Sequence, residues 1–193
     1  MAKSTRGKEK RDALVAACAE LFWQKGYANT SIADIAAHAG IPVGNVYYYF
    51  RSKAEMADAV AAVFVAETES LIGDIGAQTE EPRERLAALV QRLAQSARSR
   101  VAHGCPVGGC VHEFRRDAEP AADRAAEAFS LLVGFMAREL GRTGLRPSAA
   151  MAAARGALSD WQGGIVLAHA LRDTTVMAES FRRMERTLRL AQG

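Results

Sequence analysis

The chain has 193 residues, of which 49% are hydrophobic, and carries a formal net charge of +3 at pH 7. This length fits one large domain or a small domain joined to a medium one, with enough apolar residues for a core. No apolar run approaches the roughly 18 residues that span a bilayer, and no apolar signal segment follows the basic N-terminus. Three cysteines are too few, and odd in number, for a disulfide scaffold. We therefore expect a cytoplasmic protein without a membrane segment.

The basic residues gather at the start of the chain. Residues 1–53 contain eight Lys or Arg but only four Asp or Glu, so this segment carries +4 and the remainder about −1. A basic head on a nearly neutral body indicates a polyanion as the partner of the head, although a solvated basic tail would give the same count.

The hydrophobic pattern is helical along the whole chain. Apolar residues recur every three or four positions, and no alternating run bounded by turns indicates a strand. The sequence therefore predicts an all-α protein of about nine helices. Ser31, followed by Asp34, predicts a capping box at the second helix. The expected helices cover residues 14–25, 31–40, 42–50, 52–71, 82–101, a short segment ending near 117, 120–140, 147–168 and 174–188.

The second and third expected helices are joined by a short turn that contains Gly40, which is the arrangement of a helix-turn-helix unit. In such units the second helix enters the major groove of DNA. We expect Val46 and Phe50 to point inward, and at least one of Tyr48 and Tyr49 to be available outside. Tyr47 fits either the core or the DNA. The side chains suited to bases or phosphates are Asn45, Tyr47, Tyr48, Tyr49 and Lys53.

Residues 30–53 resemble the DNA-binding head of the TetR family. The opening Thr-Ser-x-x-x-Ile-Ala of that family is present at residues 30–36, and Ala-Gly-Ile follows at 39–41. Val-Tyr-x-Tyr-Phe occupies 46–50, and Arg-Ser-Lys occupies 51–53. The resemblance extends over about residues 8–58. It implies a helix-turn-helix domain at residues 1–53, and a ligand-binding and dimerisation domain at 54–193 whose helix 54–73 is a connector.

The resemblance also implies a function, namely repression at a double-stranded DNA operator until an effector of unknown identity, a small molecule, releases the protein. By position it places nine residues at the DNA. They are Thr30, Ser31, Val43, Gly44, Asn45, Tyr47, Tyr48, Tyr49 and Lys53. Many relatives have a basic residue where this chain has Val43, and Ala33 also occupies a position that is often basic. Specificity is therefore expected to rest on Asn45, Tyr48 and DNA shape.

The last two expected helices are rich in small residues, and Gly156, Gly163 and Gly164 permit close helix approach. The resemblance implies that these helices form a homodimer through a two-fold, four-helix interface, which would match a pseudo-palindromic operator. We expect the arginines of the last helix to face solvent. They are Arg182, Arg183, Arg186 and Arg189.

The effector site is expected among the middle helices, where aromatic and methionine side chains fit a ligand wall or an ordinary core equally well. The candidates are Phe64, Phe114, Phe135, Met136, Trp161 and His169.

The segment 104–113 resembles that of a family branch with Gly-Cys-x-x-Gly, and some members of that branch sense electrophiles or oxidants through this cysteine. Cys105 precedes an expected helix start, a position that can activate a thiol, and His112 and Arg115 are close to it in sequence. Cys110 could act as its resolving partner, so Cys105, Cys110 and His112 are the sensor candidates. The alternative is that Cys105 merely packs at a tight junction.

Cys105, Cys110 and His112 offer three zinc ligands, but their spacing fits no standard site. We expect no metal, no cofactor and no enzymatic activity. A thiol- or metal-dependent module with a vestigial DNA-binding head is the alternative function.

Overall fold

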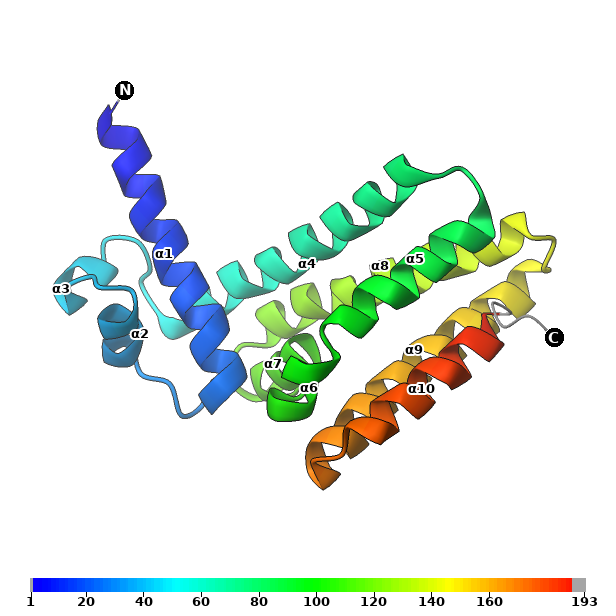
Figure 1. Ribbon diagram of the computed structural model, residues 1–193. Helices are drawn as coiled ribbons and strands as arrows, with labels where there is room; N and C mark the ends of the chain where they lie inside the picture. Colours follow the sequence, from blue (N-terminus) through cyan, green and yellow to red (C-terminus); the bar gives the residue numbers. More distant parts are fainter. Residues whose placement is uncertain (1, 189–193) are drawn as a thin grey trace. The chain divides into compact units, whose positions relative to one another are not determined.

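The computed structural model describes residues 2–188, with side chains from Arg6 onward. Helices joined by turns make up this range, without a strand, which confirms the predicted fold class (Figure 1). The helices are α1 (Ala2–Lys25), α2 (Ile32–His38), α3 (Val43–Val46), α4 (Lys53–Gln78), α5 (Pro82–Gln95), α6 (Ala97–His103), α7 (Pro106–Asp117), α8 (Glu119–Arg142), α9 (Pro147–Leu171) and α10 (Thr174–Thr187).

The helix expected over residues 82–101 is divided at Ser96 into α5 and α6. The Ser96 hydroxyl donates a hydrogen bond to the Leu93 carbonyl at 2.8 Å, and the Ser96 amide bonds to the same carbonyl at 3.2 Å. A serine that bonds to its own preceding turn competes with the helical ladder, so one expected helix becomes two.

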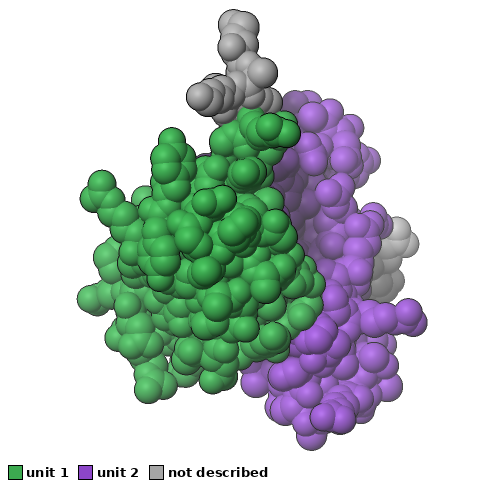
Figure 2. All heavy atoms as spheres, turned by 90° about the vertical axis from the view of Figure 1, so that its left-hand side faces the viewer, with its two compact units in different colours: residues 1–65, 106–126 green, residues 66–105, 127–193 purple. Residues whose placement is uncertain are grey.

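The chain forms two compact units, which are coloured separately in Figure 2. The first unit comprises residues 1–65 and 106–126, and the second comprises 66–105 and 127–193. These boundaries differ from the predicted division after residue 53. The first unit also contains the first half of α4, all of α7 and the start of α8.

An aromatic cluster explains why α7 belongs to the first unit. The Phe114 ring of α7 lies edge-on to Phe22 and Tyr27, with ring centres 6.0 and 5.2 Å away. All three side chains are buried. Edge-to-face pairs at these distances stabilise a core beyond the area that they bury.

The second unit is built around a core supplied by the second half of α4 and by α5, α8, α9 and α10. Helices α9 and α10 pack along each other (Figure 1). The fully buried Glu139 carboxylate of α8 is matched by Arg142 at 2.6 Å, Arg138 at 3.3 Å and Arg85 at 3.5 Å. Surrounding cations compensate for the desolvation of this buried charge.

Within residues 2–188, no helix combines the length and apolarity needed to cross a membrane. Arg182 and Arg186 of α10 are exposed and Arg183 is half-buried, so the arginine face is largely as predicted. Arg189, the last member of that predicted face, lies outside the described residues.

Candidate DNA-binding surface and effector site

The start of α2 is fixed by the capping box that the sequence predicted. The Ser31 hydroxyl accepts a hydrogen bond from the Asp34 amide at 3.1 Å, and the Asp34 carboxylate accepts from the Ser31 amide at 2.9 Å. These bonds hold the pKa of Asp34 below its ordinary value, with the Ser31 hydroxyl as the largest cause. Local bonds of this kind satisfy helix N–H groups that lack intrahelical partners.

Helix α3 is shorter than the sequence predicted, since it ends at Val46 rather than near Phe50. The chain continues in a tight turn, in which the Tyr49 and Phe50 amides both bond to the Val46 carbonyl, at 2.9 and 3.0 Å. Val46 and Phe50 are buried as predicted and anchor this turn from beneath.

The segment 43–49, which we call the tip, presents most of its side chains to solvent, and Val46 is its buried member. Tyr48 is 85% exposed, Tyr47 is 57% exposed and Val43 is 49% exposed. Gly44 and Asn45 are also exposed, whereas Tyr49 is half-buried with its ring edge-on to Tyr48 at 5.2 Å. Tyr47 therefore lies outside the core, which removes one of its two predicted placements, and its contact with DNA stays a prediction.

Thr30, which the sequence placed at the DNA, is buried instead, with 1% of its surface exposed. Its hydroxyl donates to the Gly26 carbonyl at 2.7 Å and lies 3.4 Å from the Leu21 carbonyl. The side chain ties the loop after α1 to the end of that helix, so it is not available for a phosphate.

Lys53, the predicted phosphate ligand, is also used within the chain. Its ammonium donates to the Tyr27 carbonyl at 2.6 Å and to the Thr30 carbonyl at 2.9 Å, and it lies 4.2 Å from the centre of the Tyr27 ring. The loop between α1 and α2 is thus held by a lysine from the start of α4. Sequence reasoning did not foresee this structural role, and the phosphate contact of Lys53 stays a prediction.

The same loop is held from α7 by Glu113, which sequence reasoning did not single out as a functional residue. The Glu113 carboxylate accepts a hydrogen bond from the Ala28 amide at 2.8 Å. Its oxygen would lie only 2.6 Å from a side chain placed on Gly26, where φ is +85°. The positive φ is the reason for glycine at this position, since other residues rarely adopt that backbone conformation.

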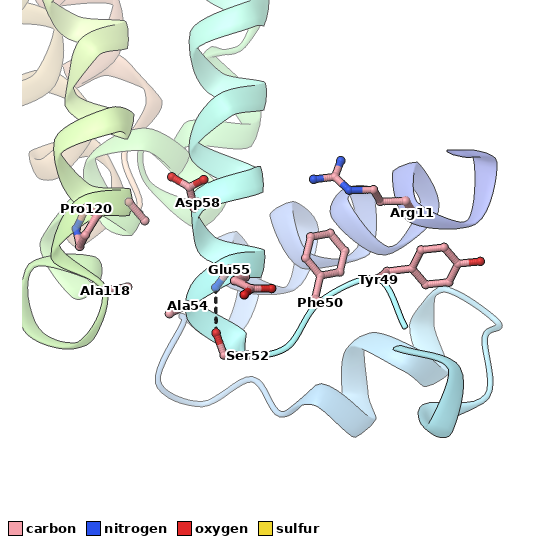
Figure 3. Close-up of a pocket in the computed structure, with 10 residues that line it drawn as sticks. Arg11, Tyr49, Phe50, Ser52, Ala54, Glu55, Asp58, Ala118 and Pro120 are labelled. Carbon is pink, nitrogen blue, oxygen red and sulfur yellow. Dashed lines mark hydrogen bonds between the residues drawn. The ribbon is translucent and has the colours of Figure 1, made fainter. Parts of the chain in front are cut away.

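Arg11 and Arg51 are exposed cations near the tip that the sequence counted but did not place. The Arg11 guanidinium lies 5.0 Å from the centre of the Phe50 ring. Figure 3 shows Arg11 and Tyr49 on the wall of a cleft of about 390 Å³, which Ser52, Glu55 and Asp58 also line. The Ser52 hydroxyl accepts from the Glu55 amide at 3.2 Å and starts α4. Positive charge at the tip therefore comes from flanking segments rather than from α3.

The predicted effector residues divide between the two units. Phe64 and Phe114 are buried in the core of the first unit, which fits the alternative of ordinary core packing, and their place in a ligand wall stays a prediction. The first unit also contains the buried Cys110 and the exposed His112.

In the second unit Phe135, Met136 and Trp161 are buried in the core. His169 is exposed there, and its Nδ1 lies 3.0 Å from the Val101 carbonyl oxygen. Within residues 2–188, no group of three or more His, Cys, Asp or Glu side chains is arranged to hold a metal ion.

Cys105 is half-buried and directly precedes the first residue of α7, as predicted. Arg100 is one partner of its thiol. The Arg100 guanidinium contacts Cys105 Sγ at 3.6 Å and lies 5.0 Å from the centre of the Trp161 ring. Sequence reasoning missed Arg100 because it predicted one continuous helix over residues 82–101. The break at Ser96, which makes α6 a separate helix that carries Arg100, was not foreseen.

Comparison with known proteins identifies both parts of the chain. The family described as bacterial regulatory proteins, tetR family, matches residues 14–60. The family described as the LmrA/YxaF-like transcriptional regulator C-terminal domain matches residues 82–182. The chain belongs to the TetR family.

Curated TetR-family relatives span nearly the whole chain. An uncharacterized helix-turn-helix regulator of Lactococcus lactis is 29% identical, covering 89% of this chain and 89% of its own length. The transcriptional regulator LmrA of Bacillus subtilis is 26% identical, covering 86% and 90%. The solved structure of a TetR-family regulator from Streptomyces coelicolor shares the fold, with a TM-score of 0.83 and 18% identity over 94% of this chain and 95% of that one.

As a TetR-family member, the chain is a helix-turn-helix transcriptional regulator that binds DNA. Its helices α2 and α3 are the helix-turn-helix pair, and its LmrA/YxaF-like part lies in α5–α10.

Proposed function

We propose that this TetR-family protein is a dimeric repressor that reads a pseudo-palindromic operator through its tip and leaves the DNA when an effector acts on the second unit. One observation carries the proposal: the tip exposes Val43, Asn45, Tyr47 and Tyr48 while Val46 and Phe50 fix its backbone from within. A rigid, outward-facing segment of this kind is what entry into a major groove requires.

The proposed readout uses no arginine from α3. The Asn45 amide can pair with both the N6 and N7 positions of an adenine, and Val43 or a tyrosine ring can contact a thymine methyl group. Ser31, Gly44 and Tyr49 are proposed phosphate or sugar contacts, joined by Arg11 and Arg51 as sources of positive charge. Without an arginine–guanine pair, the shape and deformability of the operator contribute part of the specificity.

The proposed dimer forms through α9 and α10. Val166, Leu167 and Leu171 of α9 are each more than half exposed, and Gly163 on the same helix is exposed as well. These positions repeat at helical spacing and form an apolar stripe that a two-fold partner would cover. Such a dimer would set its two tips one DNA turn, or a multiple of it, apart.

Release is proposed to begin in the second unit, either by binding of a small molecule or by modification of the Cys105 thiol. Cys105 is half-buried and contacts a guanidinium, which can stabilise negative charge on sulfur. Cys105→Ser tests this branch. It should bind the operator normally and no longer be released by an alkylating electrophile, and unaltered release would remove the thiol from the mechanism.

Footprinting on the DNA upstream of the protein's own gene tests the function as a whole. The wild type should protect a pseudo-palindromic site, and Tyr48→Ala should weaken that complex at least tenfold. Gln24→Ala, which alters an exposed residue of α1 outside the tip, is the matched control and should leave the affinity unchanged. If no salt-sensitive, sequence-specific complex forms on any upstream fragment, the proposed function is wrong.

A further inference from the structure

Arg100 differs from the other half-buried arginines of the second unit, because it has no carboxylate partner. Arg85 pairs with Glu139, and Arg183 pairs with Asp160 at 3.3 Å. Within the described residues, no acidic side chain lies within ion-pair distance of Arg100. Burial lowers the pKa of its guanidinium, and contact with Cys105 opposes this effect. A partly desolvated cation without a counter-charge is costly unless something else supplies one.

The contacts that Arg100 does make hold it in one orientation. Its Nε donates to the Ser96 hydroxyl at 2.9 Å, and its Nη1 lies 3.6 Å from Cys105 Sγ. Its Cζ atom lies over the Trp161 ring, 5.0 Å from the ring centre. The Ser96 hydroxyl and the Cys105 thiol are neutral, weak acceptors. Guanidinium N–H groups of Arg100 therefore remain for a stronger acceptor. A guanidinium fixed by stacking and one side bond is well arranged for bidentate recognition of a carboxylate.

The indole N–H of Trp161, the residue that Arg100 lies over, has no acceptor among the described residues. The Trp161 side chain is 3% exposed, and its indole Nε1 has no hydrogen-bond partner among the described residues. The Nε2 atom of the adjacent Gln162 is buried and unpartnered in the same way. Buried indole N–H groups normally find an acceptor. This region therefore offers a cation and two buried donors that have no acceptor of their own.

Helix α6, which carries Arg100, contributes no fully buried residue to the second unit. Its Val101 is only partly buried against the core, and its ends lie at the Ser96 break and at Gly104, where φ is +76°. Little packing energy therefore opposes a small displacement of this short helix, as admission of a ligand beside Trp161 would require.

We propose that Arg100 and the indole N–H of Trp161 recognise a small aromatic carboxylate, which is the effector class of this regulator. The carboxylate accepts from the Arg100 guanidinium and from Trp161 Nε1, and the apolar body of the ligand packs on the Trp161 ring and Val101. This inference rests on the proposed function only in calling the ligand an effector, because binding itself can be measured without DNA.

The position of Arg100 also offers a route by which ligand binding would affect the DNA-binding unit. A carboxylate that draws the guanidinium away from Cys105 acts at the residue next to the first residue of α7. The same helix carries Glu113, which holds the Ala28 amide of the loop before α2. Movement of α7 would thus alter the loop that sets the start of the helix-turn-helix pair.

Tryptophan fluorescence tests the site directly, because the chain has only two tryptophans. Trp23→Phe leaves Trp161 as the sole reporter, and the titrants are benzoate, its neutral analogue benzamide, and inorganic phosphate. We expect benzoate to change the Trp161 emission saturably, with benzamide and phosphate at least tenfold weaker. If benzamide bound as tightly as benzoate, the site would not recognise the negative charge. If phosphate bound as tightly as benzoate, the site would not recognise the aromatic part of the ligand.

Two variants in the Trp23→Phe background assign the contacts. Arg100→Gln should weaken benzoate binding at least tenfold, while Arg100→Lys should retain part of it, and circular dichroism checks that both are folded. Unchanged benzoate affinity in folded Arg100→Gln would overturn the proposal. In otherwise wild-type protein, Trp161→Phe keeps a six-membered aromatic ring and removes the pyrrole part of the indole with its N–H. Isothermal calorimetry should then report severalfold weaker benzoate binding, and an unchanged affinity would exclude the indole as a donor.

Operator release is measured separately, by gel shift with benzoate and benzamide. Release by benzoate alone, abolished in Arg100→Gln, supports the effector assignment. Saturable binding without release would refute it while leaving the binding site intact. Absence of any operator complex would instead contradict the proposed function, and the fluorescence titration would still report on the site.

Discussion

Lys53 provides the sharpest test of how the DNA-binding unit is held together, because sequence and structure assign it different roles. Replacement by methionine keeps most of the side-chain volume and removes the ammonium that donates to Tyr27 and Thr30. Charge-assisted hydrogen bonds contribute about 1.5–3 kcal/mol each, and a cation over an aromatic ring about 0.5–1 kcal/mol. Because Lys53 is half-buried and water can replace part of this, we expect Lys53→Met to lose about 2–4 kcal/mol of unfolding free energy.

Urea denaturation of DNA-free protein gives this free energy, with Lys10→Met as the control that removes an exposed lysine of α1. The control should change the unfolding free energy by less than about 0.5 kcal/mol. If Lys53 were instead a phosphate ligand, Lys53→Met would be as stable as the wild type. Its operator affinity would then depend less on salt, with a slope smaller by about 0.9 for one lost phosphate contact. That result would refute the loop-holding role.

Three further predictions concern local chemistry. Gly164→Ala would place a methyl group of α9 against the Ser180 side chain of α10. The unfolding midpoint in urea should therefore fall by an amount equivalent to about 1–3 kcal/mol. An unchanged midpoint would mean that α9 and α10 separate easily. Burial raises the pKa of the fully buried Cys18 to about 12. Mass spectrometry should therefore find this thiol unmodified by iodoacetamide in the native protein, and rapid modification would contradict its burial. Bonds from Ser31 lower the pKa of Asp34, so the stability that this carboxylate contributes is present above about pH 4 and is lost as the pH falls through its lowered pKa. The difference in unfolding free energy between wild type and Asp34→Ala should therefore shrink in acid, and a constant difference would show that the charge does not matter.

The sequence predicted features that depend on neighbouring residues. The capping box at Ser31 and Asp34 needs only a spacing of three, and the inward faces of Val46 and Phe50 follow from helical periodicity. The predicted end of the first helix at residue 25 is equally local. These elements were correct because their determinants lie within one turn of the chain.

The errors concern contacts between residues far apart in sequence. Phe114 joins the core around Phe22 and Tyr27, and no local pattern distinguishes this from a ligand wall. Lys53 would look the same in sequence whether it held carbonyls or phosphates. Arg100 went unnoticed because its environment depends on the break at Ser96, where a side-chain hydrogen bond overrides a continuous helical pattern.

The central claim is that the tip reads bases without an arginine. It is tested most directly by the ratio of operator affinity to random-sequence affinity for Asn45→Ala, measured across a range of salt concentrations. Loss of one bidentate base contact costs about 1–3 kcal/mol, so the ratio should fall by roughly 5- to 150-fold while the salt slope stays that of the wild type. An unchanged ratio, or a loss that is equal on operator and random DNA, would contradict base readout by the tip.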